Sequence, residues 1–95
     1  MDGVRIKQLK ANLGGINQAQ LAQLLGVSPN AVARWESGMR RPKLDNLVPL
    51  SAHGVSLEWL AGNSDDFCRP GATFDSVASA VKARLELLEA QTQTA

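Results

Sequence analysis

The sequence predicts an all-α protein, with five short helices followed by one longer C-terminal helix. Apolar residues recur three and four positions apart, which is the spacing of one helix face. Helix-start signals at Asn17 or Ile16 and at Ser28-Pro29, and stop signals at Gly26 and Gly38, divide the chain into short segments. A heptad-like apolar seam after residue 73 lasts longer than any of these segments. Together these features predict helices joined by short turns.

The length and composition favour one soluble globular domain. Ninety-five residues suffice for one hydrophobic core and one additional helix, but not for two independent cores. The chain is 44% apolar and 20% charged, and it has two Trp, two Phe and no Tyr, so its core is mainly aliphatic. Cys68 has no second cysteine to pair with, and Cys68 with His53 cannot complete a zinc site. We therefore expect no metal and no cofactor. A chain without disulfides also suits the reducing cytoplasm.

Residues 3–13 form the first predicted helix, and residues 18–25 form the second. Gly14-Gly15 ends the first helix, and Gly26 closes the second at the position after its last turn. The apolar faces of the two helices are formed by Ile6, Leu9, Leu13, Leu21 and Leu25.

The third helix is expected to open at Ser28-Pro29, an N-cap followed by proline at the first helical position, and to end near Glu36. Its apolar side carries Val32 and Trp35. Its opposite side carries Pro29, Asn30, Ala33 and Arg34.

Two further short helices are expected before residue 63. Leu44, Leu47 and Leu50 mark the fourth helix. We expect a late or slightly distorted start near residue 45 or 46, because Pro49 would then fall in its first turn. The fifth covers residues 56–61 with Ser56 as its N-cap.

Residues 64–72 have loop chemistry and indicate a linker, and residues 73–95 contain the longest helical pattern. A helix of this length is marginal alone in water and needs a packing partner. It either folds back on its own domain, residues 1–63, or pairs with a second copy as a dimerisation helix. The predicted dimerisation seam consists of Phe74, Ala78, Val81, Leu85 and Leu88.

The net charge of +1 hides an asymmetry along the chain. Residues 1–64 hold seven cationic and four anionic side chains, a net charge of +3. Residues 65–95 hold three and five, a net charge of −2. The two parts are expected to have different partners, and a basic N-terminal part is compatible with nucleic acid.

Residues 18–36 place two short helices across a tight turn. Ala22 lets the two backbones approach, and Gly26 permits the turn. The exposed ridge of the second helix carries the Asn30 amide and the Arg34 guanidinium and no acidic residue, which suits the DNA major groove. On spacing alone, two ordinary packed helices with a polar surface remain the alternative. The shared apolar wedge consists of Leu21, Leu25, Val27, Val32 and Trp35.

Residues 16–38, INQAQLAQLLGVSPNAVARWESG, resemble the helix-turn-helix of lambdoid phage repressors and of the wider Cro/C1-type regulators, the XRE family. The resemblance continues through RRPKLDNLVPLSAHGVSLEWLAGN and covers roughly residues 3–63. It implies a five-helix lambda repressor-like DNA-binding domain, to which this chain adds a C-terminal helix.

The resemblance also implies roles for individual residues. Lys10 and Glu36 are similar to a cation and glutamate that pair to orient the recognition helix. The base-reading positions are Ser28, Pro29, Asn30, Ala33 and Arg34. The phosphate-contacting positions are Gln18, Gly38, Arg40, Arg41 and Lys43.

The sequence thus favours a DNA-binding transcriptional regulator, a repressor that binds a pseudo-palindromic operator as a homodimer through residues 29–36. The alternative is an antitoxin-like autorepressor whose C-terminal helix binds a partner protein. An enzyme is not indicated, because the chain lacks a nucleophile paired with a base and a phosphate-binding glycine loop. Neither a signal peptide nor a membrane span is expected.

Overall fold

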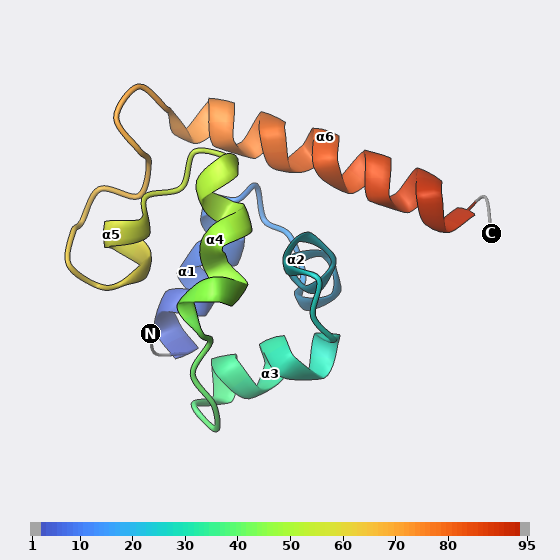
Figure 1. Cartoon of the computed structure of the whole chain (residues 1–95), viewed down its shortest axis with the longest axis horizontal. Coiled ribbons are helices and arrows are strands. Elements are labelled where there is room, and N and C mark those ends of the chain that lie inside the picture. Colours follow the sequence, from blue (N-terminus) through green and yellow to red (C-terminus); the bar gives the residue numbers. More distant parts are fainter. Residues whose placement is uncertain (1–2, 94–95) are drawn as a thin grey trace.

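The computed structural model describes residues 3–93, except for the side chains of residues 44 and 91–93. Residues 1–2 and 94–95, at the ends of the predicted ranges, lie outside this description. The described chain is helical, which confirms the predicted all-α class. The helices in chain order are α1 (Gly3–Asn12), α2 (Gln18–Leu25), α3 (Pro29–Ser37), α4 (Leu44–Ala52), α5 (Leu57–Leu60) and α6 (Phe74–Gln93) (Figure 1).

The boundaries of α2 and α3 follow from local capping chemistry. At the start of α2, the Asn17 side chain accepts a hydrogen bond from the Gln20 backbone at 2.8 Å, and the Gln20 side chain accepts one from the Asn17 backbone at 3.0 Å. Ser28 caps α3 by accepting from the Ala31 N–H at 3.3 Å. Gly26 and Gly38 end the two helices with φ of 69° and 81°, a conformation that favours glycine.

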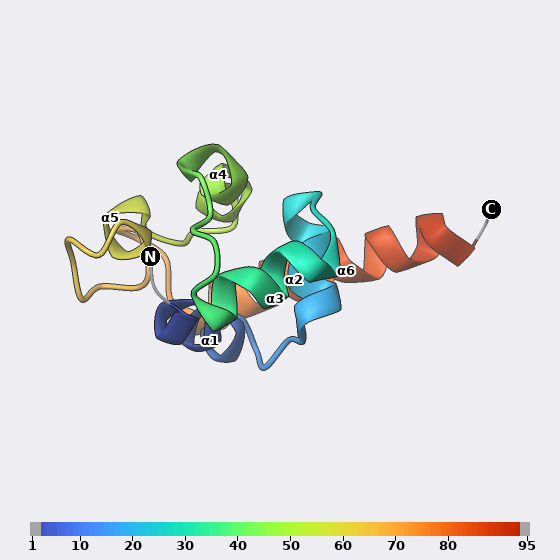
Figure 2. The same cartoon turned by 90° about the horizontal axis from the view of Figure 1, so that it is seen from below.

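A single hydrophobic core joins all of these helices. Figure 1 shows α6 along one side of the molecule and α3 along the opposite side, with α1, α2 and α4 between them. Figure 2, seen from below, places α3 in front and shows the C-terminal turns of α6 extending beyond the other helices. The buried side chains include Ile6, Leu9, Leu13, Leu21, Leu25, Val32, Trp35, Leu47, Leu50, Trp59, Val77 and Val81.

The segment expected as a linker, residues 64–72, joins α5 to α6 as a loop and packs against the domain. Phe67 is only 3% exposed, and its ring meets the Trp59 ring edge-on at a centroid distance of 4.7 Å. Its carbonyl accepts from the Ser56 N–H at 2.8 Å, and the Arg69 N–H donates to the Gly54 carbonyl at 2.8 Å. The buried Phe67 ring and these two backbone hydrogen bonds together hold the segment against the domain.

Part of the predicted dimerisation seam lies in the core of its own chain. Of the seam Phe74, Ala78, Val81, Leu85 and Leu88, Val81 and Leu85 are buried in the core of their own chain. Val77, which the seam did not include, is buried with them. The helix folds back on its own domain along α2, so Val77, Val81 and Leu85 face that domain, whereas Phe74 is 55% exposed.

The fourth helix begins earlier than expected. It starts at Leu44, so Pro49 lies inside the helix rather than in its first turn. Because proline has no N–H, it cannot donate to the Asp45 carbonyl one turn before it. Packing of Leu47 and Leu50 into the core stabilises the helix despite this missing bond.

We predict that Phe67→Ala lowers the free energy of unfolding by about 3–5 kcal/mol, because a buried aromatic ring is lost and a cavity remains. Phe74→Ala is the matched control, since Phe74 stacks on Phe67 but is 55% exposed. It should cost roughly 1 kcal/mol. Urea unfolding of both variants measures the difference. If Phe67→Ala lowers the free energy of unfolding by as little as the control does, Phe67 does not hold the loop against the domain.

Candidate nucleic-acid interface

The steep crossing of α2 and α3 is fixed by small and apolar residues at their contact. Ala22 is buried where the two helices meet, and the Val27 N–H donates to the Ala22 carbonyl at 3.0 Å across the turn. Val32 and Trp35 of α3 pack into the core together with Leu21 and Leu25. Since these residues hold one side of α3, its other side is presented to solvent.

The exposed side of α3 is narrow and carries no acidic group. Pro29, Asn30 and Arg34 are exposed, and Ala33 is half-buried between them. These are four of the five predicted base-reading residues, and the fifth, Ser28, is exposed immediately before the helix. The structure therefore brings all five together on one ridge, which is the size of surface that a major groove admits.

The carboxylate of Glu36 connects three helices beside this ridge. The Lys10 ammonium on α1 forms an ion pair with Oε1, and the Gln18 amide on α2 donates to Oε2 at 2.5 Å. The Lys10 and Glu36 side chains are 19% and 10% exposed, so this contact is largely shielded from water. The ion pair expected between Lys10 and Glu36 is present, and Gln18 is a second partner of the Glu36 carboxylate.

The protonation of Glu36 reflects these contacts. Burial raises the pKa of its carboxyl, but hydrogen bonds from Lys10 and Gln18, with the positive charges of Lys10 and Lys7, outweigh burial and hold the pKa below its ordinary value. The carboxylate is therefore charged at neutral pH. Its charge is matched by Lys10, so it does not repel a phosphate placed on the ridge.

The role of Gly3 could not be predicted from the sequence. A Cβ at this position would overlap the backbone carbonyl of Glu36, so the first turn of α1 lies directly against the last turn of α3. Nothing in the local pattern marks this glycine, because it begins a helix and needs no unusual φ. The close approach depends only on how the two helices cross.

A basic segment follows α3 directly. Arg40, Arg41 and Lys43 are all exposed, as a phosphate-contacting loop requires. Gly38 does not fit its predicted role, because its N–H donates to the carbonyls of Arg34 and Trp35 within the helix cap. The arrangement thus offers three cationic side chains rather than a backbone donor at Gly38.

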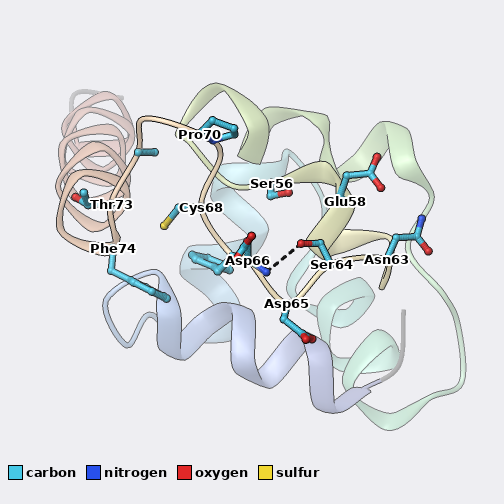
Figure 3. A pocket seen from close by; sticks show the side chains of 12 residues that line it. Ser56, Glu58, Asn63, Ser64, Asp65, Asp66, Cys68, Pro70, Thr73 and Phe74 are labelled. Atoms are coloured by element: carbon cyan, nitrogen blue, oxygen red, sulfur yellow. Dashed lines mark hydrogen bonds between the residues drawn. The ribbon is translucent and has the colours of Figure 1, made fainter.

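A different surface lies between α5, the 62–72 loop and the start of α6, where a groove of about 750 Å³ is found (Figure 3). The carboxylates of Glu58, Asp65 and Asp66 surround it, so it repels nucleic acid. Burial raises the pKa of the Cys68 thiol, which keeps this thiol protonated. Acidic and basic surfaces are therefore separated on the molecule.

Two further features of the described residues bear on the class of protein. None of the described helices is both long enough and apolar enough to cross a membrane. Within residues 3–93, no three His, Cys, Asp or Glu side chains are grouped so that they could hold a metal ion.

Two helices that cross at a tight turn, with a polar ridge on the second and cations after it, define a DNA-binding helix-turn-helix protein. Residues 6–60, more than half of the chain, match the family model described as helix-turn-helix. The chain belongs to this family, the Cro/C1-type or XRE family of DNA-binding transcription regulators. The matched domain is non-enzymatic. No solved structure gives a significant match.

We predict that Glu36→Gln lowers the free energy of unfolding at pH 7 by about 1–3 kcal/mol, because a charged hydrogen-bonding partner of Lys10 is lost. The folded-state pKa of Glu36 is lowered, so its stabilisation is present above the ordinary value of 4.5 and disappears as the pH falls through the folded value. The difference between wild type and variant, measured by urea unfolding, should therefore shrink below pH 4.5.

Glu58→Gln is the control for this series, since Glu58 is exposed on α5 and forms no ion pair with another described residue. It should change stability by no more than about 0.5 kcal/mol at either pH. A difference for Glu36→Gln that stays constant down to pH 3 would contradict the role of the charged carboxylate.

Proposed function

We propose that the protein is a transcriptional repressor that binds a pseudo-palindromic operator as a dimer. The observation that carries this proposal is the exposed ridge of α3, where Asn30 and Arg34 stand on a helix held rigidly by Val32 and Trp35. A rigid helix with exposed amide and guanidinium groups discriminates between base pairs, whereas flexible basic residues bind any sequence.

Each residue on the ridge has a chemical partner in the major groove. The Arg34 guanidinium can donate to O6 and N7 of guanine, and the Asn30 amide can pair with N6 and N7 of adenine. Pro29 and Ala33 offer apolar contact to a thymine methyl. The Ser28 oxygen accepts from Ala31, so its hydroxyl hydrogen is left for a phosphate or a base edge.

The phosphate contacts border this ridge on two sides. The Gln18 amide has two hydrogens, and since one is donated to Glu36, the second is left for a phosphate beside the first turn of α2. Beyond the other end of α3, the DNA phosphates are bound by Arg40, Arg41 and Lys43. In this proposal the Lys10 and Glu36 pair orients these groups and touches no DNA.

A dimer is proposed because a single short helix reads only about one half-site, whereas useful specificity needs two half-sites about one helical turn apart. Val81 and Leu85 are occupied in the core, so the dimer would use other parts of α6. Leu87 of α6 is 50% exposed, and it supports this choice. The C-terminal turns of α6 extend beyond the other helices (Figure 2). In this proposal the protein acts in the cytoplasm, without a cofactor.

The same exposed turns support a second candidate, an antitoxin-like autorepressor. Here a partner protein, rather than a second copy of the chain, covers Leu87 and the end of α6. Val77, Val81 and Leu85 of α6 are already buried in the core, so only the exposed residues of this helix would be available to such a partner.

Footprinting over a salt series, on the DNA flanking the protein's own gene, tests the proposal. We expect a protected pseudo-palindrome whose occupancy falls steeply as the salt concentration rises. Arg34→Ala should lose about 10- to 100-fold in affinity for this site, because one bidentate base contact is removed. Two protected half-sites about one helical turn apart would report the dimer.

Arg84→Ala is the matched control, since Arg84 is exposed on α6, away from α3. It removes the same charge and should leave the footprint unchanged. Equal losses in the two variants, or uniform binding without a protected site, would contradict a sequence-reading role for α3. Binding that appears only after a second protein is added would favour the antitoxin-like candidate.

A further inference from the structure

Lys7 on α1 is a cation that neither the domain's packing nor the predicted site accounts for. It is exposed, and it forms no ion pair with any residue between 3 and 93. Gly3, Lys7 and Lys10 are spaced by four and three positions, so they share one face of α1. The structure fixes the direction of that face at both ends.

Both ends of this face contact Glu36. Gly3 lies against the Glu36 backbone carbonyl, and the Lys10 ammonium pairs with the Glu36 carboxylate. Lys7 lies between these two contacts along the helix, and therefore beside the last turn of α3. Consistent with this position, the positive charge of Lys7 helps to lower the pKa of Glu36.

The ammonium groups of the two lysines on this face differ in whether they can bind another partner. The charge of Lys10 is matched by Glu36, and its side chain is mostly buried. Lys7 has a solvent-exposed ammonium whose charge is not matched by a direct partner among the described residues. Glu36 also binds Gln18, which begins α2, and Arg40 and Arg41 follow α3. Lys7 thus lies between two groups of proposed phosphate contacts.

We infer that Lys7 is an additional phosphate contact, which extends the DNA-binding surface from the start of α2 across α1 to the loop after α3. The inference rests on the proposed function and adds a sequence-independent contact to it. An ammonium on a flexible stem suits this task, because it binds a phosphate as a point charge without reading bases.

Salt dependence of DNA binding tests this assignment. With Lys7→Gln, the slope of log Kobs against log salt concentration should fall by about 0.9, because one fewer counterion is released from DNA. At 0.15 M salt this corresponds to a loss of about fivefold in affinity. The loss should be the same for the operator and for an unrelated duplex, since a phosphate contact carries no sequence information.

Two control variants make the result specific. Lys7→Arg keeps the charge and should keep the slope. Lys82→Gln removes an exposed lysine from α6, which lies on the side of the molecule opposite α3, and should change neither slope nor affinity (Figure 1). Thermal unfolding of each variant checks that the fold is retained.

Three results would overturn the inference. An unchanged slope in Lys7→Gln would show that Lys7 acts only on Glu36. A loss confined to the operator would make Lys7 a determinant of sequence rather than a phosphate contact. If the wild-type protein itself binds DNA without salt dependence, the proposed function fails. Failure of the inference alone looks different, because the wild type then binds as expected and only the Lys7→Gln variant shows no change.

Discussion

The position of α3 depends on the carboxylate of Glu36, which is shared by Lys10 and Gln18. This one group connects α1, α2 and α3 at the edge of the exposed ridge. Ion pairs on open surfaces contribute little, but this pair is largely shielded from water and has a second hydrogen bond. Its charge is also neutralised locally, so this acidic residue adds little negative charge beside the cationic residues that follow α3. The close approach of Gly3 to the Glu36 backbone supports the same junction.

Outside this junction, positively and negatively charged side chains lie on different surfaces of the molecule. Cationic side chains gather near α3, whereas the acidic groove formed by α5, the 62–72 loop and the start of α6 lies elsewhere. Phe67 anchors the loop of this second surface by packing against Trp59, and α6 completes the core through Val77 and Val81. The sequence asymmetry between a basic and an acidic part therefore becomes two surfaces on one domain.

Local chemistry allowed the sequence to predict most of the fold. Capping by Asn17 and Ser28 and the glycines at 26 and 38 depend on neighbouring residues, so the bounds of α2 and α3 agree with the prediction within a residue. What the sequence could not predict depends on tertiary contacts. An apolar stripe such as Val81 and Leu85 has the same spacing whether it faces its own core or a second copy, and the loop composition around Phe67 does not show that its ring is buried.

The candidate site divides in the same way. Local spacing alone placed Asn30 and Arg34 on the exposed face of α3, because Val32 and Trp35 mark the opposite face. The third contact of Glu36, with Gln18, and the overlap that excludes a side chain at Gly3 come from residues far apart in the sequence. The position of Lys7 beside Glu36 likewise becomes visible only when the helices are assembled.

Chemical-shift mapping of the backbone amides during titration with an operator duplex tests the central claim most directly. If α3 reads DNA, the largest changes should fall on residues 17–19, 29–37 and 39–43, while residues 56–74 around the acidic groove stay unchanged. Changes concentrated in residues 56–74, with α3 unaffected, would contradict the account and place the nucleic-acid interface elsewhere.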